Sequence, residues 1–340
     1  MEKKDGFKSE FLESEGKDKS MCRVAVLGLG WWGSKLFRNV CSHPAVERAA
    51  GVDPCAARRE EMAKNANVSM FATPEEVFRD PSIKAVVIAT PPATHFDLAR
   101  AAFEAGKDVL VTKPPTRTIE EVEYLTALAQ NNGCIFMMDS TFIYSEPVGK
   151  IRELLDGHLF TDILFIQSLR YGNDLRMHHV NRLRETMLAN GMSVATDLLF
   201  HDMAILNYLL PGKSFRPKAG HQVNMLSNTL CDTAFIRLDT DTFPIHIGLS
   251  WTLPERKREL IICDREKQLI FDDLAAGNKL KLFWIEEKRE EEITHGNEEP
   301  LSRVIGHFLN CIQTRNTPFT DGAYMLGVMK SFQAVLELFL

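Results

Sequence analysis

The 340-residue sequence lacks any apolar run long enough to cross a bilayer, and its N-terminus lacks the apolar core of a signal peptide. It also lacks a basic excess, because its formal net charge is −6, which argues against a nucleic-acid partner. The seven cysteines form no C-x-x-C pair, and this odd, scattered set argues against a disulfide framework or a zinc site. These absences predict a cytoplasmic protein with reduced thiols, no bound metal and no membrane partner.

The composition that remains is that of a globular protein, with 45% hydrophobic and 25% charged residues. The length suits two domains better than one. Residues 1–20 form a charged, glycine-containing tail that we expect to be disordered. We predict a nucleotide-binding domain over 21–145 and a second domain over 146–340.

A glycine motif near the start of the first domain is the strongest signal in the chain. The apolar run 24–27 predicts a buried strand, and it leads directly into Gly-Leu-Gly-Trp-Trp-Gly at 28–33. A helical pattern follows over 34–40, and the next apolar run ends on Asp53, twenty residues beyond the motif. A strand before, a helix after and an acid at the next strand end form the context of a dinucleotide-binding fingerprint.

The glycines of the motif have separate expected roles. Gly28 permits the tight turn, Gly30 lets the backbone approach a pyrophosphate, and Gly33 lets helix and strand pack closely. The pyrophosphate would lie at the helix N-terminus, where free N–H groups attract an anion. Trp31 and Trp32 lie inside the motif, so we expect them to contact the cofactor as well.

Asp53 bears on the choice of cofactor. A carboxylate at this position accepts hydrogen bonds from a ribose diol and repels a 2′-phosphate, which favours NAD over NADP. Arg58 and Arg59 follow closely and could weaken that repulsion, although they also fit a solvated helix face.

Further candidate residues follow the fourth and fifth predicted strands. Strand and helix patterns alternate from 23 to 139, which predicts a doubly wound parallel sheet that binds ligands beyond its carboxyl ends. Thr90, Pro91 and His95 come after the fourth strand, and we expect them at the cofactor edge, although a capping or surface role also fits the histidine. Lys113 comes after the fifth strand, where it is either functional or a solvent-facing loop charge.

A long, largely apolar helix over 193–210 carries two ionisable groups of the second domain. Asp197 and His201 are four residues apart and so share one helix face. Such groups are costly on a buried helix unless they are paired or functional, and a structural Asp–His hydrogen bond is the alternative. Asp202 fits a structural contact on another face.

The rest of the second domain is rich in strands from 215 onward, which predicts an α+β domain with an open, mostly antiparallel sheet covered on one side by helices. The bare face predicts a homodimer or homotetramer. The polar segment 171–190 is either a lining of the substrate cleft or a solvated loop, and its basic residues are Arg176, His178, His179, Arg182 and Arg184.

Together, these stretches resemble the glucose–fructose oxidoreductase / inositol dehydrogenase (Gfo/Idh/MocA) family over 23–340. The resemblance rests on the glycine motif, on Ala-Gly-Lys-Asp-Val-Leu-Val-Thr-Lys-Pro at 105–114, and on Asp-Leu-Leu-Phe-His-Asp at 197–202. It implies that Lys113, Asp197 and His201 are the catalytic residues. The family's usual Glu-Lys-Pro is here Thr-Lys-Pro, with Thr112 in place of the glutamate, and this departure bears on how the lysine is positioned.

The resemblance implies an NAD(P)-dependent enzyme that moves hydride between the nicotinamide and a secondary alcohol of a sugar, nucleotide sugar or cyclitol. His201 would be the general base, Lys113 would stabilise the developing oxyanion, and Asp197 would orient the imidazole or bind a hydroxyl. The stretch 202–210 looks most like members that act on nucleotide sugars, such as UDP-N-acetylglucosamine 3-dehydrogenases. The alternatives are carbonyl or imine reduction, redox-neutral 3-keto glycoside chemistry, dehalogenation, or a non-catalytic NAD-binding sensor.

Overall fold

The computed structural model describes residues 22–64, 68–172, 193–225 and 231–339, and these form two compact units. The first unit extends to Tyr144 and also includes Glu298–Gly327, whereas the second comprises Ser145–Asn297 and the chain from Val328 onward. The expected disordered tail, 1–20, lies outside the described residues. In the described part of the chain, no helix is both long enough and apolar enough to span a membrane.

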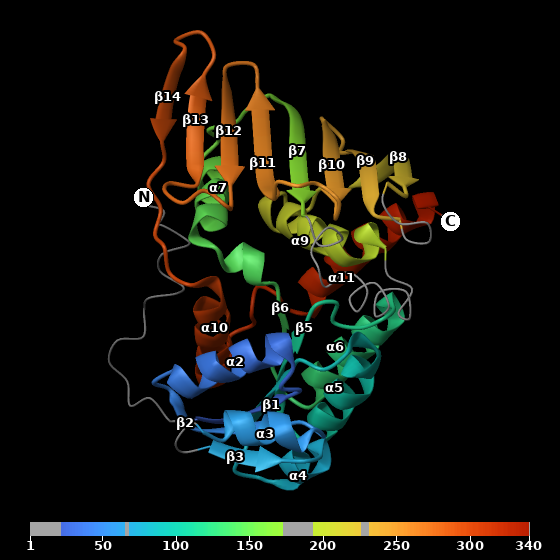
Figure 1. Ribbon diagram of the computed structural model, residues 1–340, viewed down its shortest axis with the longest axis vertical. Helices are drawn as coiled ribbons and strands as arrows, with labels where there is room; N and C mark the ends of the chain where they lie inside the picture. The colour runs from blue at the N-terminus through green and yellow to red at the C-terminus, as the bar shows by residue number, and fades with distance from the viewer. Residues whose placement is uncertain (1–21, 65–67, 173–192, 226–230, 340) are drawn as a thin grey trace. The chain divides into compact units, whose positions relative to one another are not determined.

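The first unit contains a six-stranded parallel sheet with the strand order β3-β2-β1-β4-β5-β6 (Figure 1). This is the doubly wound order of dinucleotide-binding proteins, so the predicted fold of the first domain is confirmed. Strands β1, β4, β5 and β6 are buried almost throughout, as expected of strands covered on both faces. The strands are β1 (Cys22–Leu27), β2 (Val46–Val52), β3 (Val68–Phe71), β4 (Ala85–Ile88), β5 (Asp108–Thr112) and β6 (Phe136–Asp139).

Local capping residues fix where several helices of this unit begin. Thr73 and Glu76 form a capping box at the start of α4, with Pro74 in the first turn. The Thr118 hydroxyl accepts a hydrogen bond from the amide of Glu121 at the start of α6. The helices are α2 (Trp31–Ser42), α3 (Ala56–Met62), α4 (Pro74–Arg79), α5 (His95–Glu104) and α6 (Ile119–Asn131), with the 3₁₀ turns η1 (Pro92–Thr94) and η2 (Thr141–Tyr144).

Helix α10 (Pro300–Thr314) belongs to the first unit and packs against α2 and η2. The sequence analysis placed all of 146–340 in the second domain, and the structure differs for 298–327. The reason is physical: an amphipathic pattern shows that one helix face is buried, but not which domain buries it. Just beyond α10, Arg315 forms an ion pair with the buried carboxylate of Asp108 at 2.7 Å.

The second unit contains an eight-stranded sheet with the order β14-β13-β12-β11-β7-β10-β9-β8. Every neighbouring pair is antiparallel except β7 with β10, which confirms the predicted mostly antiparallel sheet. Strand β14 is an exposed edge, as expected for the acidic cluster there. The strands are β7 (Ile163–Tyr171), β8 (Arg216–Val223), β9 (Thr233–Asp239), β10 (Pro244–Ser250), β11 (Lys257–Asp264), β12 (Lys267–Asp272), β13 (Leu280–Trp284) and β14 (Arg289–Glu292).

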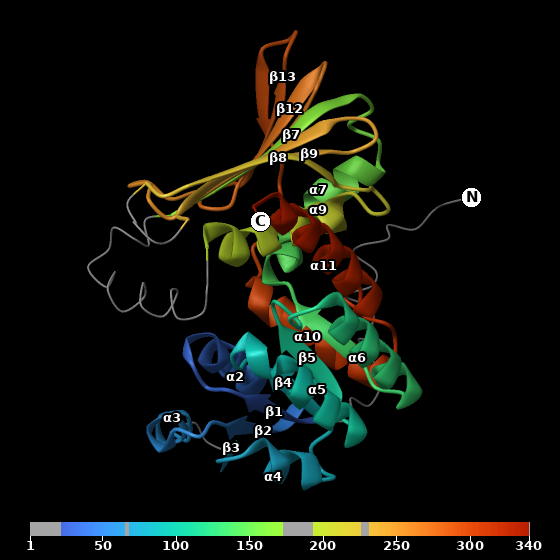
Figure 2. The same cartoon turned by 90° about the vertical axis from the view of Figure 1, so that its right-hand side faces the viewer.

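Helices α7 (Glu146–Asp156) and α9 (Phe200–Leu209) lie on one side of this sheet (Figure 2). The covered face of β10 carries Ile245, Ile247 and Leu249, which are buried, whereas His246 on the other face is exposed. The second boundary between the units falls inside α11 (Gly322–Leu336), which continues into the short turn η4 (Glu337–Phe339).

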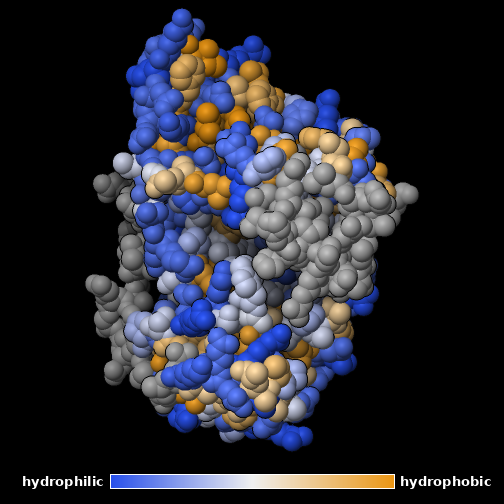
Figure 3. Space-filling model, viewed as in Figure 1, coloured by the Kyte–Doolittle hydropathy of each residue, from blue (hydrophilic) through white to orange (hydrophobic). Residues whose placement is uncertain are grey.

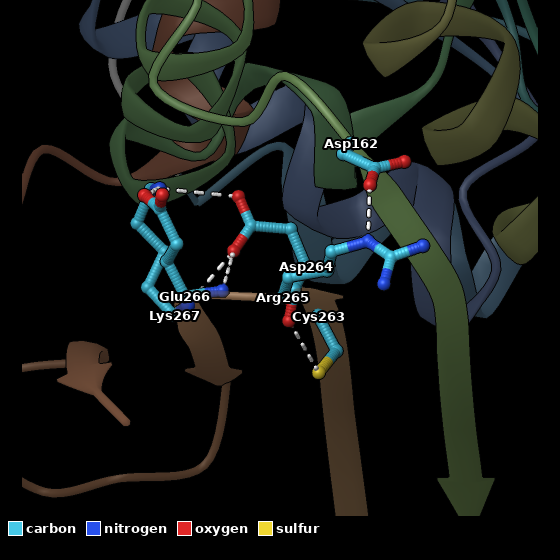
Figure 4. Close-up of polar contacts among 6 residues, drawn as sticks. All are labelled: Asp162, Cys263, Asp264, Arg265, Glu266 and Lys267. Atoms are coloured by element: carbon cyan, nitrogen blue, oxygen red, sulfur yellow. Dashed lines mark hydrogen bonds and ion pairs between the residues drawn. The ribbon is translucent and has the colours of Figure 1, made fainter. Parts of the chain in front are cut away.

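The turn between β11 and β12 shows how buried and exposed charges differ in this sheet (Figure 4). The Asp264 carboxylate accepts hydrogen bonds from the amides of Glu266 and Lys267 and pairs with the Lys267 ammonium at 3.1 Å, and both side chains are buried. The neighbouring Arg265 pairs with Asp162 in solvent. Asp264 therefore closes the hairpin through local hydrogen bonds.

Candidate active site

The turn after β1 has the close contacts that the glycine motif predicts. Gly28 has a φ of +89°, and its amide donates to the carbonyl of Val52 at 2.7 Å. A Cβ added to Gly33 would lie 1.9 Å from the carbonyl oxygen of Gly28, so the helix approaches the turn more closely than any side chain allows. A Cβ added to Gly30 meets nothing within 4 Å, which leaves open space beside the backbone where a pyrophosphate could bind.

Asp53, directly after β2, is 2% exposed and holds this turn from the neighbouring strand. One carboxylate oxygen accepts from the amide of Leu29 at 2.9 Å, and the other accepts from the amide of Cys55 at 2.9 Å. Burial alone would raise the pKa of Asp53, but these bonds and the Arg58 guanidinium hold it below its ordinary value. The carboxylate is therefore ionised, and it shapes the turn through these bonds; its contact with a ribose stays a prediction.

The two arginines that follow Asp53 are placed differently. Arg58 contacts the Asp53 carboxylate at 3.3 Å, yet its side chain remains 56% exposed. Arg59 instead donates to the carbonyls of Asp53 and Pro54 at 2.6 and 3.0 Å. A guanidinium beside the acid lowers the repulsion of a 2′-phosphate, so the geometry leaves room for NADP as well as NAD.

The two tryptophans of the motif point to different surroundings. Trp31 is 75% exposed, and the Lys35 ammonium lies 3.8 Å from the centre of its ring. Trp32 is half-buried, and its indole N–H donates to the carboxylate of Asp139 at 2.8 Å. Trp31 is therefore the more exposed of the two beside the glycine turn.

His95 joins the loops that follow β4 and β5. Its ring is fully buried, with Nδ1 2.9 Å from the carbonyl oxygen of Pro114 and Nε2 2.8 Å from that of Thr90. Burial lowers the pKa of His95 although the two carbonyls act in the opposite direction. The Thr112 hydroxyl lies 3.5 Å from Nε2, so the residue that replaces the family's glutamate faces this ring. These contacts are those of a histidine that fixes both loops; contact with the cofactor stays a prediction.

Lys113 follows β5 directly, and Pro91 follows β4 after Thr90, so all three lie at the carboxyl edge of the first sheet. The Lys113 side chain is half-buried, and its peptide bond to Pro114 is cis. This edge also carries the glycine turn and Asp53, since Leu27 pairs with Val52 and with Ile88 in the sheet register, and Ile88 pairs with Val111. The first unit therefore brings its predicted site residues to one edge.

Asp197 and His201 belong to the second unit, on the run that precedes and enters α9. The first turn, η3 (Ala195–Leu199), is π-helical and contains Asp197, whereas His201 lies in the first turn of α9. The predicted single α-helix over 193–210 is thus interrupted at its start, and π-helical turns occur frequently at functional sites. Both side chains are half-buried.

Asp202, next to His201, has the structural role that the sequence predicted. Its carboxylate accepts from the Ser168 hydroxyl at 2.6 Å and from the Arg170 guanidinium at 3.1 Å, both on β7. The basic residues of 171–190, which the sequence analysis offered as a cleft lining, all lie outside the described residues. Within the described ranges, no group of three His, Cys, Asp or Glu side chains is arranged to hold a metal ion.

The sequence analysis missed Asp139, the last residue of β6. It is 3% exposed, and burial raises its pKa, against the effects of Thr141, Trp32 and the nearby Lys113 charge. An acid directly after a buried strand at the carboxyl edge of a parallel sheet was the available signal.

The fold of the first unit and the residues at the carboxyl edge of its sheet together define the class of the protein: a dinucleotide-binding protein of the Rossmann type.

Comparison with known proteins finds a match between the first unit and one family. Residues 22–140 match the model of the Gfo/Idh/MocA oxidoreductase family, described as an NAD-binding Rossmann fold. The match covers β1 through β6, and its family is the one that the sequence resembles.

Relatives of known activity match different lengths of the chain. The scyllo-inositol 2-dehydrogenase (NAD(+)) of Bacillus subtilis is 37% identical over 115 residues, which are 33% of this chain and 34% of that protein. The UDP-N-acetylglucosamine 3-dehydrogenase of Acidithiobacillus ferrooxidans is 23% identical over 309 residues, which are 88% of this chain and 91% of that protein. The chain spans only 34% to 54% of the length of three relatives that it matches, the inositol dehydrogenase among them.

Solved structures share the whole fold. The Acidithiobacillus enzyme superposes with a TM-score of 0.77 at 21% identity, over 93% of this chain and 97% of its own. An oxidoreductase of Desulfitobacterium hafniense, described as NADPH-dependent, gives a TM-score of 0.82 at 16% identity, over 94% and 95% of the two chains. Both predicted sheets thus occur together in these solved structures.

Proposed function

We propose that this protein is an NAD(P)-dependent dehydrogenase of a secondary alcohol on a sugar, nucleotide sugar or cyclitol. The observation that carries the proposal is the carboxyl edge of the first sheet, which combines the glycine turn, the ionised Asp53 and Lys113. The turn fits a dinucleotide, because backbone replaces side chain at Gly28 and Gly33 and the space beside Gly30 is open. A nucleotide-sugar substrate is favoured by the relative that matches 88% of this chain.

When bound, the nicotinamide supplies the acceptor for hydride. In the proposed reaction His201 removes the hydroxyl proton as a general base, since imidazole titrates near neutral pH, and such a base contributes about 10²–10⁴ in rate. The Lys113 ammonium donates a hydrogen bond to the same oxygen and stabilises its developing negative charge. Asp197 orients the imidazole or binds a neighbouring hydroxyl.

The cofactor preference follows from Asp53 and Arg58. We propose NAD as the working cofactor, because the acid remains ionised and repels a 2′-phosphate. The exposed Arg58 keeps that preference moderate. Arg58→Ala should increase the ratio of the NADP to the NAD dissociation constant several-fold, whereas an unchanged ratio would remove Arg58 from cofactor selection.

Lys113→Ala tests the catalytic role. We expect kcat with UDP-N-acetylglucosamine to fall at least ~10²-fold while the NAD dissociation constant changes little, because the lysine acts on the reacting oxygen. Lys281→Ala, which removes an exposed lysine paired with Glu290 on the second sheet, is the matched control and should keep full activity. Unchanged turnover in Lys113→Ala removes the lysine from the mechanism.

The face of the second sheet that α7 and α9 leave bare supports a homodimer or homotetramer as a further part of the proposal. Phe235 on β9 is 52% exposed on this face. Gly248 on β10 and the half-buried Leu169 on β7 lie beside it in the sheet register. Apolar and hydrophilic side chains are interspersed over β11–β13 (Figure 3). A monomeric mass by light scattering would contradict self-association.

All seven cysteines are unpaired, which supports the proposed cytoplasmic location.

A further inference from the structure

A partly buried hydrogen bond connects the glycine turn to the far side of the first sheet. The indole N–H of Trp32, at the start of α2, donates to Asp139 at the end of β6, 107 residues later. In the sheet, β1 and β6 are separated by β4 and β5. The bond therefore crosses the carboxyl ends of two strands, and β5 is the strand that leads into Lys113.

Asp139 has few possible partners, because only 3% of its surface is exposed. One carboxylate oxygen accepts from Trp32 at 2.8 Å, and the other accepts from the Thr141 hydroxyl at 2.5 Å. A buried carboxyl group is costly unless its oxygens are satisfied, and here each oxygen has a donor. The arrangement fixes the carboxylate at the edge of the sheet.

Asp139 also lies within electrostatic reach of Lys113. Thr112 pairs with Asp139 in the register of β5 and β6, and Lys113 is the next residue along the chain. The positive charge of Lys113 acts on the Asp139 carboxyl against the effect of burial. Because Asp139 is removed from water, an electrostatic interaction with it is stronger than the same interaction in solvent.

We propose that Asp139 is a positioning residue for the dehydrogenase reaction: held by Trp32, it fixes the Lys113 ammonium relative to the dinucleotide turn. The inference rests on the proposed function for its catalytic meaning, but the arrangement itself can be tested without turnover. It gives Trp32 a second role, since its side chain then connects the nucleotide turn with the proposed catalytic lysine.

The decisive experiment measures how fast the Lys113 amine reacts with acetic anhydride, by mass spectrometry of the digested protein at neutral pH. Lys281 in the same sample is the internal reference. In Asp139→Asn, which keeps an oxygen to accept from Trp32 but removes the acid, we expect Lys113 to react about 3-fold faster or more, because its amine is no longer held beside the Asp139 carboxyl group. A Lys113 rate equal to that of the wild type overturns the proposal.

A double-mutant cycle tests the bridge through Trp32. Trp32→Phe should change the Lys113 rate at least about 2-fold in the wild-type background and leave it unchanged in Asp139→Asn, because residues that act through one contact are not additive. Equal changes in both backgrounds would mean that Trp32 acts independently of Asp139, which overturns the bridge. Trp284→Phe is the matched control: that indole N–H is buried in the second unit without a hydrogen-bond partner among the described atoms.

Activity then separates this inference from the proposed function. With UDP-N-acetylglucosamine as substrate, Asp139→Asn should lower kcat about tenfold while KM for NAD stays within about 2-fold, the pattern of a change at the reacting group. A loss of NAD binding with kcat unchanged would overturn the assignment to Lys113. Absence of turnover in the wild-type protein would count against the proposed function alone, because the labelling result still decides whether Asp139 acts on Lys113.

Discussion

Removal of Asp202 should destabilise the second unit more than removal of any exposed acid. Its side chain is 1% exposed and pairs with Arg170, which is 9% exposed, at 3.1 Å. The Arg170 charge already acts on the neighbouring Arg258 guanidinium, whose pKa is lowered by burial first and by Arg170 second. Without Asp202, the buried Arg170 guanidinium loses its carboxylate partner, while the half-buried Arg258 beside it keeps its pair with Asp273.

The magnitude follows from this burial. Removal of one partner of a buried ion pair costs about 3–5 kcal/mol, whereas an exposed pair contributes about 0–1 kcal/mol. Asp202→Ala should therefore lower the free energy of unfolding by about 3–5 kcal/mol, a large part of the stability of an ordinary domain. Asp162→Asn, which breaks the exposed pair with Arg265 shown in Figure 4, should change it by less than about 1 kcal/mol.

Urea unfolding followed by intrinsic fluorescence measures both values, and hydrogen exchange of the β7 and α9 peptides locates the loss. Arg170→Met combined with Asp202→Leu should recover most of the stability, because an apolar pair of similar size leaves no buried charge behind. If Asp202→Ala destabilises the protein no more than Asp162→Asn, or if the double variant is as unstable as the two single changes added together, the argument from burial is wrong.

Two further predictions concern the first unit. Burial lowers the pKa of His307 from 6.5 to about 4, and Nδ1 of its neutral ring lies 2.9 Å from the Tyr144 hydroxyl. The contribution of this residue to the free energy of unfolding is therefore complete above pH 6.5 and is lost as the pH falls toward 4. Between pH 6.5 and pH 4, the free energy of unfolding of His307→Gln should therefore fall by about 3 kcal/mol less than that of the wild type, as measured by urea titrations. Equal decreases in the two proteins would rule out this histidine as the cause. Gly33→Ala should destabilise the protein by about 1–3 kcal/mol and weaken NAD binding, because its Cβ would meet the backbone of Gly28. Gly30→Ala, whose Cβ meets nothing, should unfold within about 0.5 kcal/mol of the wild type, and equal effects of the two changes would contradict the packing argument.

The local features of the first sheet could be predicted from the sequence because their causes are local. Gly33 must be glycine for reasons that lie within one strand–turn–helix unit, and Lys113 follows an apolar run that can only be a buried strand. The regular alternation of strands and helices then determines the order of the sheet.

Features that depend on contacts distant in sequence could not be predicted. The amphipathic pattern of α10 does not show which unit covers it, and the bond between Trp32 and Asp139 joins residues 107 positions apart. His95 was ambiguous for the same reason, since two backbone carbonyls, which no sequence pattern reveals, fix its ring. The π-helical turn at Asp197 is likewise a departure in hydrogen bonding that the apolar pattern of 193–210 does not encode.

The central claim is that the chain transfers hydride between an alcohol and a nicotinamide cofactor. It is tested most directly by the near-ultraviolet absorbance of NADH when NAD, and then NADP, is added to the protein with UDP-N-acetylglucosamine, its uronic acid, free sugars and inositols. The account predicts NADH formation with one class of these alcohols, faster with NAD than with NADP, and its loss in Lys113→Ala. Tight binding of NAD without reduction by any alcohol of the panel would contradict it and favour a non-catalytic sensor or a cofactor recycled in place.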